Sequence, residues 1–183
     1  MLKSIHAKNI LITGNPGVGM TTLIHETISK LNILAGGFYT AEIRDDNNKR
    51  WGFKIISLDG QEEVMASVDI VSSRKVSKYG VNPEAVDRIG VTAIEKAVAE
   101  NDLVVIDEIG RMELISKLFR KAVFSALDSP KPVLGTIAIK ETNASRKIKE
   151  RQDTKVIRLT RDNYDQVFTH IQRILPHLVN SKA

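Results

Sequence analysis

The sequence predicts a three-layer α/β fold in which helices cover both faces of a mostly parallel sheet. Short apolar runs alternate with stretches of helical periodicity, which is the element order of such folds. Residues 103–106 are continuously apolar, as in a strand that is buried on both faces of a parallel sheet. A glycine-rich loop at 14–19 lies between a predicted strand and a predicted helix. Together these observations favour parallel strands joined by right-handed helical crossovers.

Composition is typical of a globular protein with a single domain, 1–183. The chain has 183 residues, 42% of them hydrophobic, and it has no cysteine, which excludes disulfides and thiolate metal sites. Its net charge of +5 is dispersed, so nucleic-acid binding is possible but not indicated. The four histidines show no metal-ligand spacing. The N-terminus lacks a secretory signal, and no run approaches the ~18 apolar residues of a membrane span, so we expect a soluble cytoplasmic monomer.

The first predicted strand and helix flank a phosphate-binding loop. Residues 9–13 are apolar and rich in β-branched side chains, and 23–31 carry apolar residues at helical spacing. Between them the sequence matches G-x-x-x-x-G-K-[ST] except at one position. Glycines let backbone N–H groups turn toward a phosphate, and the helix that follows offers its free N–H groups to the same anion. The residues expected to contact a nucleotide are Gly14, Asn15, Pro16, Gly17, Val18, Gly19, Met20, Thr21 and Thr22.

Met20 occupies the position of the loop lysine, whose charge meets the β- and γ-phosphates in this motif. Methionine has a similar length and is compatible with a helix, but it carries no charge. Loss of one electrostatic stabiliser of a transition state costs about 3–4 kcal/mol, so we expect nucleotide binding with impaired turnover. No other Lys or Arg lies between residues 14 and 29 to replace it. Met20 is either a natural replacement or an introduced one, and the chemical consequence is the same.

Residues 36–68 predict antiparallel hairpins inserted after the first α/β unit. Three β-like runs, at 37–43, 52–58 and 64–68, are joined by turns too short to hold a crossover helix. We expect these hairpins to form an edge or a lid. The Ser-rich basic sequence that follows, up to residue 78, is expected to be a mobile loop.

Helices and strands alternate through the rest of the chain. Asn82 before Pro83 is typical of a helix start, because Asn caps the first turn and proline fits its first position. The predicted elements are a helix at 83–100, a strand at 103–106, an amphipathic helix whose apolar face runs from Ile115 to Leu127 and includes Leu118, a strand at 132–139, a basic polar segment at 143–151, a strand at 156–159, and a helix that starts near Thr160 and is bent or ended by Pro176.

Asp107 and Glu108 follow the apolar strand at 103–106. An acidic residue at this place holds Mg²⁺ opposite a phosphate loop, so Thr21 and Asp107 are the expected metal ligands. Glu108 is placed to orient or deprotonate the water that attacks the γ-phosphate. The alternative is a polar strand end that caps the next helix, and the phosphate loop earlier in the chain favours the magnesium site.

Hydrolysis also needs a cation on the negative charge that develops in the transition state. With Met20 neutral, the candidates are Arg111, Lys140, Arg146, Lys147 and Arg151. Arg111 is favoured because it follows Asp107 and Glu108 closely. The basic residues at 146–151 are more typical of a solvated helix face.

Four segments carry a resemblance to a known family: the loop at 14–19, Gly-Phe-Tyr-Thr-Ala-Glu-Ile-Arg at 37–44, Tyr-Gly-Val-Asn at 79–82, and Val-Ile-Asp-Glu-Ile-Gly-Arg-Met-Glu-Leu at 105–114. With them the chain resembles the THEP-type nucleoside-triphosphatases, also called cancer-related NTPases, over nearly its whole length. The resemblance implies a RecA-like P-loop fold and Mg²⁺-dependent hydrolysis of ATP, GTP, CTP and UTP or TTP. It assigns phosphate binding to the loop, Mg²⁺ to Thr21 and Asp107, and the attacking water to Glu108. The sequence departs from the family at Met20 and at Tyr164, where the family often has arginine.

Two other functions are compatible with the same motifs. A non-catalytic switch would bind nucleotide merely to order the hairpins. A kinase-like phosphotransferase acting on a nucleoside or nucleotide would need a deep pocket for the acceptor.

Overall fold

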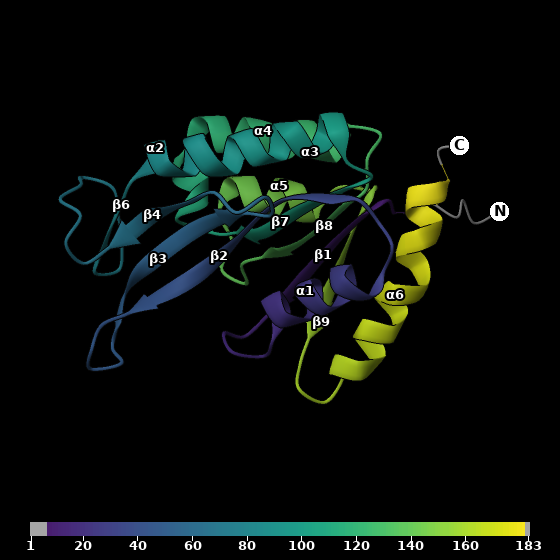
Figure 1. The fold of residues 1–183 in the computed structure, drawn as a ribbon, viewed down its shortest axis with the longest axis horizontal. Helices are drawn as coiled ribbons and strands as arrows, with labels where there is room; N and C mark the ends of the chain where they lie inside the picture. Colours follow the sequence, from purple (N-terminus) through teal and green to yellow (C-terminus); the bar gives the residue numbers. More distant parts are fainter. Residues whose placement is uncertain (1–6, 182–183) are drawn as a thin grey trace.

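The computed structural model describes residues 7–181, which form a nine-stranded sheet covered by helices (Figure 1). Residues 1–6, on which part of the expectation about a secretory signal rests, and residues 182–183 lie outside the described residues. The strands follow the spatial order β5-β6-β4-β3-β2-β7-β8-β1-β9. Their bounds are β1 (Asn9–Gly14), β2 (Ala35–Arg44), β3 (Arg50–Ser57), β4 (Glu62–Ser67), β5 (Lys75–Val76), β6 (Tyr79–Val81), β7 (Leu103–Ile109), β8 (Val133–Ile137) and β9 (Thr154–Leu159).

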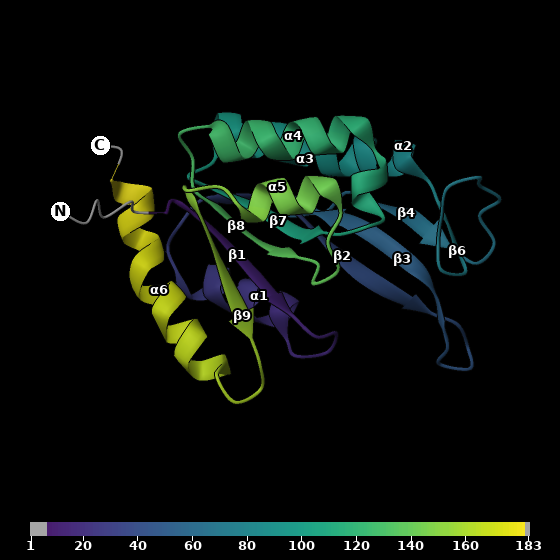
Figure 2. The ribbon, with the colours of Figure 1, turned by 180° about the vertical axis from the view of Figure 1, so that it is seen from behind.

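Helices lie on both faces of the sheet, as the alternation of elements predicts (Figures 1 and 2). On one face are α1 (Met20–Lys30) and α6 (Tyr164–Asn180), and on the other are α3 (Thr92–Glu100), α4 (Lys117–Asp128) and α5 (Asn143–Lys149). Strand β1 shows why two layers form, because its successive side chains point to opposite faces. Ile10 and Ile12 belong to the apolar core under α1 and α6, whereas Leu11 belongs to the core under α3 and α4.

The predicted hairpins are present, and they continue the main sheet. Strand β2 pairs in parallel with β7 and antiparallel with β3, so it joins the parallel strands to the hairpin strands β3, β4, β6 and β5. Gly37, at φ +120°, permits this contact, because a Cβ there would lie 2.0 Å from the Val105 carbonyl oxygen. Strands β2, β7, β8, β1 and β9 form the predicted parallel sheet, and the hairpins make the sheet as a whole mixed.

The segment before residue 79 differs from the expected loop. Residues 75–81 form a short hairpin in which β5 pairs with β6, and β6 in turn pairs with β4. Ser77 takes the left-handed conformation at φ 57°, which closes the tight turn between the two strands. The expectation failed because strands of two and three residues are too short to show an alternating pattern.

The predicted helix at 83–100 is one helical run of three segments, α2 (Pro83–Ala85), the π-helical η1 (Val86–Val91) and α3. It begins as expected, because the Asn82 side chain accepts a hydrogen bond from the Ala85 N–H at 3.2 Å. The run ends at Glu100.

The later helices differ from expectation at their ends and on one face. Helix α6 begins at Tyr164 and not near Thr160, because the Thr160 N–H donates to the Asn163 side chain at 2.8 Å and the chain turns there. Pro176 does not end α6, which continues to Asn180, because burial of side chains such as Leu175 outweighs one lost backbone hydrogen bond. In α4, Leu118 is 55% exposed and leaves the predicted apolar face.

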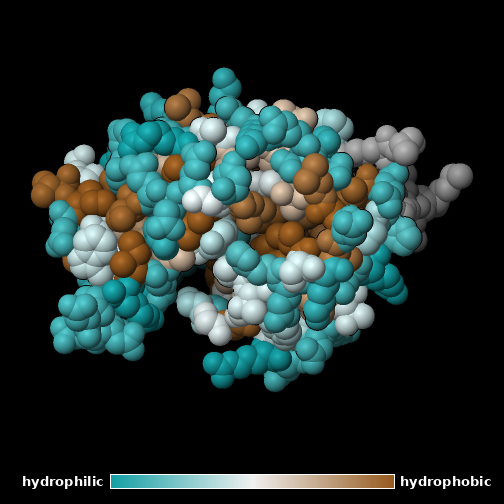
Figure 3. All heavy atoms as spheres, in the orientation of Figure 1, coloured by the Kyte–Doolittle hydropathy of each residue, from teal (hydrophilic) through white to brown (hydrophobic). Residues whose placement is uncertain are grey.

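Among the residues described, no helix is both long enough and apolar enough to cross a membrane. Hydrophobic residues that reach the surface gather in bands between more polar regions (Figure 3).

Candidate functional site

The phosphate loop connects the end of β1 to the start of α1. Gly17 and Gly19 have φ angles of +80° and +94°, which residues with a side chain rarely adopt. A Cβ on Gly14 would lie 2.8 Å from the Leu159 carbonyl oxygen of β9, so glycine is also needed for the close approach there. The loop backbone therefore has the left-handed turns that aim successive N–H groups at an anion.

Within residues 7–181, no protein group occupies the first N–H donors of α1. Gly19 is the N-cap residue, no described side chain caps the helix, and its first turn contains no acidic residue. The first intrahelical bond to this cap runs from the Leu23 N–H to the Gly19 carbonyl at 2.9 Å. The N–H groups of Met20, Thr21 and Thr22 are thus available to an anion, as at phosphate-binding helix starts.

Met20 lies at this helix start with its side chain partly buried. It packs against the core shared by α1 and α6, together with Val18 and Tyr164. Its sulfur lies 3.4 Å from the position that a Cβ on Gly14 would take. The side chain therefore lies along the base of the phosphate loop, where it supplies contact area without charge.

Asp107 comes to the same edge of the sheet as the phosphate loop. Strands β1 and β7 both pair in parallel with β8, so their carboxyl ends lie together. Asp107 is 2% exposed, and one of its oxygens, Oδ1, accepts a hydrogen bond from the Thr136 hydroxyl at 2.6 Å. Burial raises the pKa of Asp107, while the hydroxyls of Thr136 and Thr21 oppose that rise.

The other Asp107 oxygen, Oδ2, is buried and has no hydrogen-bond partner among the described residues. A buried carboxylate oxygen without a partner is costly unless a ligand satisfies it. Thr21 reaches this carboxyl from the helix that begins at the phosphate loop. A hydroxyl and a carboxylate are oxygen ligands of the kind that Mg²⁺ prefers, so the two predicted metal ligands fit a magnesium ion. Among the residues described, no group of three or more His, Cys, Asp or Glu side chains could hold a metal by itself.

Glu108 and Glu113 converge on Gly110. A Cβ on Gly110 would lie 3.0 Å from Oε1 of Glu108 and 2.7 Å from Oε2 of Glu113. Glu113 belongs to the short helix η2 (Glu113–Ile115) and is 4% exposed. Burial, followed by the neighbouring Glu108 carboxylate, raises the pKa of Glu113 to about 8. Burial and the Asp107 carboxylate also raise the pKa of Glu108. The pair Glu108 and Glu113 is therefore expected to hold at least one proton between them.

The buried Glu113 predicts that the protein loses stability as pH rises. The folded chain holds the Glu113 proton up to a pH of about 8, whereas the unfolded chain releases it near 4.5. Between these values only the folded chain keeps the proton, so each pH unit lowers the free energy of unfolding by up to about 1.4 kcal/mol. Urea unfolding between about pH 5 and about pH 8 should therefore show a steeper decline for the wild type than for Glu113→Gln. Equal slopes in the two proteins would contradict a buried, protonated Glu113.

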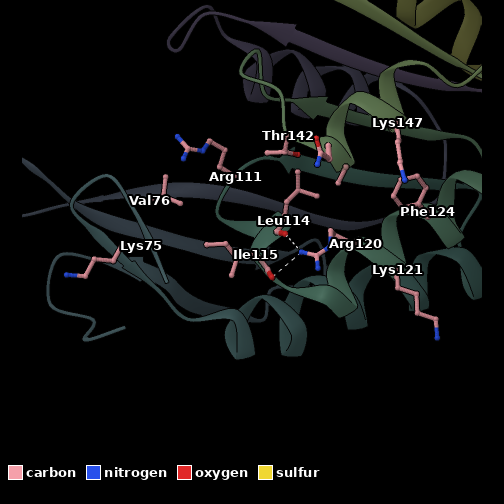
Figure 4. A pocket seen from close by; sticks show the side chains of 12 residues that line it. Lys75, Val76, Arg111, Leu114, Ile115, Arg120, Lys121, Phe124, Thr142 and Lys147 are labelled. Carbon is pink, nitrogen blue, oxygen red and sulfur yellow. Dashed lines mark hydrogen bonds between the residues drawn. The ribbon is translucent and has the colours of Figure 1, made fainter. Parts of the chain in front are cut away.

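The candidate cations lie in different surroundings. Arg151 pairs with Asp128 and Asp153 at 2.8 and 2.7 Å, and Arg146 pairs with Glu141 at 3.3 Å. Both are therefore engaged in ion pairs. Arg146 is exposed on α5, as expected for a solvated helix face, whereas Arg151 follows the end of that helix and is largely buried. Arg111 and Lys147 instead line a cavity of about 570 Å³ that no residue of the phosphate loop reaches (Figure 4). Lys140 is exposed in the turn after β8.

Sequence reasoning missed two residues at this edge, Thr136 and His25. Thr136 lies beside Asp107 only because β8 is inserted between β7 and β1. The charge of His25 opposes the rise in the pKa of Asp107, and its ring packs edge-on against Tyr39 at 4.5 Å between ring centroids. His25 stands four residues after Thr21, one helical turn along α1, and that spacing could have pointed to it.

The carboxyl edge also shows a surface recess. Figure 3 shows a hollow between the polar end of the β2–β3 hairpin and the region where Figure 1 places the loop before α1. The hollow opens beside the uncapped start of α1, and a nucleotide on the phosphate loop would face it.

Comparison with known proteins agrees with this arrangement. The family model described as NTPase matches residues 9–172. The nucleoside-triphosphatase THEP1 of Thermotoga sp. (strain RQ2) is 47% identical over 166 residues, which cover 91% of this chain and 94% of that protein. The crystal structure of THEP1 from Aquifex aeolicus superposes with a TM-score of 0.83 at 34% identity, covering 91% of this chain and 98% of that one.

A human cancer-related nucleoside triphosphatase has a similar fold. Its solution structure gives a TM-score of 0.75 at 30% identity and covers 96% of this chain and 98% of that one. The predicted resemblance and fold class are thus confirmed over most of both chains. This chain belongs to the NTPase family, the family of the THEP1 nucleoside-triphosphatases.

Proposed function

We propose that this chain is a Mg²⁺-dependent nucleoside-triphosphate phosphohydrolase with loose base preference, and that Met20 slows its turnover. We place this activity in one domain, 1–183, acting in the cytoplasm, where a chain without cysteine fits a reducing environment. One observation carries the proposal. Thr21, in the first turn of the uncapped helix α1, lies beside Asp107, and the second carboxylate oxygen of Asp107 is buried without a partner among the described residues.

The substrate phosphates would be bound by the backbone N–H groups of residues 14–22, with the dipole of α1 adding to their attraction. Thr21 and Asp107 would hold Mg²⁺, with Thr136 fixing the orientation of the Asp107 carboxyl. A bound Mg²⁺ supplies positive charge to the phosphate oxygens. We expect a loose base preference because the proposed contacts, from the loop N–H groups and from Mg²⁺, are made to the phosphates and not to the base.

Glu108 would accept a proton from the attacking water. The water oxygen bonds to the γ-phosphorus, the bond from that phosphorus to the bridging β–γ oxygen breaks, and the nucleoside diphosphate leaves with that oxygen while inorganic phosphate is released. Partial burial of Glu108 makes it a stronger base than an exposed carboxylate, because its pKa is raised. Arg111 would face the developing charge. It lies three residues beyond Glu108 and has no carboxylate partner within the described part of the chain.

Phosphate release from ATP, GTP and CTP tests the proposal. We expect slow release with Mg²⁺ and none above background with EDTA, at rates that agree within about ten-fold for the three bases. Asp107→Asn should remove the dependence on Mg²⁺ together with most of the release. Release that survives EDTA would contradict the proposal. Binding of all three nucleotides without any release, at high protein concentration, would instead favour the nucleotide-binding switch.

A further inference from the structure

The cavity beside the candidate site is lined by residues of α4 and the start of α5, with Lys75 and Val76 of β5 at one side of it (Figure 4). Its volume of about 570 Å³ is within the range of small-molecule sites, roughly 300–1,000 Å³. The residues that line it come from β5, the turn after β7, η2, α4 and the start of α5. No residue of the phosphate loop, and neither Asp107 nor Glu108, contributes to it. Arg111, the proposed cation of the hydrolytic site, also lines the cavity, so the two sites adjoin, but the cavity contains none of the proposed phosphate-binding or metal-binding residues.

The charges around the cavity have a single sign. Its lining includes Lys75, Arg111, Arg120, Lys121 and Lys147, and it includes no acidic residue. None of these five forms an ion pair among residues 7–181. Other cations of the same region are paired, since Arg146 and Lys149 of α5 share Glu141. Unpaired cations around a concave surface attract an anion and raise its local concentration.

The floor of the cavity is apolar. Ile115, Phe124, Val76 and Ala144 are partly buried against the core under α3 and α4, and Leu114 is buried within it. An inorganic anion would leave this apolar surface exposed to water, whereas an organic anion could cover it with an apolar or aromatic body. The cavity thus matches a molecule that has both a negative group and an apolar part.

Hydrogen bonds from Arg120 hold part of the cavity floor in place. Arg120 donates hydrogen bonds to the carbonyl oxygens of Leu114 and Ile115, the second at 3.2 Å. These bonds fix the last two residues of η2, the short helix whose first residue is the buried Glu113. A preformed apolar floor loses little conformational entropy when a ligand binds.

We propose that this cavity binds a small organic anion, with its apolar body on Leu114, Ile115 and Phe124 and its negative group among the surrounding lysines and arginines. The site is additional to the nucleotide site and does not depend on the proposed hydrolysis.

Fluorescence titration with 8-anilinonaphthalene-1-sulfonate, an aromatic anion, tests the proposal. We expect saturable binding to the full chain at one site. The double variant Lys121→Glu/Lys147→Glu should weaken this binding at least about ten-fold, because two attractive charges become repulsive. The matched control is Lys155→Glu/Arg173→Glu, which makes the same change of charge at exposed positions of β9 and α6. It should bind the probe like the wild type.

Displacement of the probe by competing ligands distinguishes an anion-binding site from a nonspecific hydrophobic surface. Phenyl phosphate should displace the probe, and benzyl alcohol, which has the same ring without the charge, should not. Phe124→Ala, a variant that keeps every charge, should also weaken probe binding. Equal affinities in the charge-reversed and control variants, or equal displacement by the two competitors, would overturn the proposal. So would displacement by Mg²⁺–ATP at the concentrations that fill the nucleotide site, because the probe would then lie on the phosphate loop.

Discussion

Glutamine in place of Glu108 is expected to lower Mg²⁺-dependent hydrolysis by about a hundred-fold or more, the usual loss when a general base is removed. The amide has the same shape, but it cannot take a proton from water. Nucleotide affinity should change only a few-fold, because Glu108 contributes nothing to the phosphate loop or to the start of α1. Steady-state phosphate release and equilibrium binding of a non-hydrolysable ATP analogue, measured on the same preparation, separate the two effects.

The matched control for this change is Glu95→Gln, an exposed carboxylate on α3 that should leave hydrolysis unaltered. The pH dependence gives a second readout. Because burial and Asp107 raise the pKa of Glu108, its basic form accumulates only as pH rises, and hydrolysis should increase with it. A Glu108→Gln protein that hydrolyses nucleotide at the wild-type rate would rule out this carboxylate as the base.

The phosphate loop and Asp107 could be predicted from the sequence because each is signalled locally. Gly17 and Gly19 have the left-handed φ angles that the motif requires, and residues 103–106 are fully buried, as their unbroken apolar run indicates. The start of the helix after Asn82 was likewise predictable from a single capping bond. In each case the signal lies within a few residues of the feature that it predicts.

Other features depend on contacts between distant segments. The hydrogen bond from Thr136 to Asp107 exists because β8 lies beside β7, and a strand order is not encoded in any one stretch of sequence. The burial of Glu113 runs against the usual exposure of glutamate, so only the folded chain reveals it. The start of α6 was misplaced because Thr160 is a favourable capping residue, and the turn made with Asn163 competes successfully with it.

Lysine in place of Met20 is expected to raise hydrolysis at least about ten-fold, since the charge stabilises the transition state by up to about 3–4 kcal/mol. The structure offers room for it. The four-carbon stem of lysine can follow the path of the methionine along the base of the loop, against Val18 and Tyr164, and carry its ammonium toward the phosphates. Met20→Leu, which keeps the packing and adds no charge, is the control and should remain as slow as the wild type.

The most direct test of this account compares the wild type and Met20→Lys side by side, under saturating Mg²⁺ with ATP, GTP and CTP. The account predicts that both bind nucleotide and that the variant releases phosphate at least about ten times faster with every base. That result would mean that the rest of the hydrolytic site is complete and that one charge is missing. Binding by both proteins without any gain in the variant would contradict the account and leave a nucleotide-binding module whose remaining site is also incompetent.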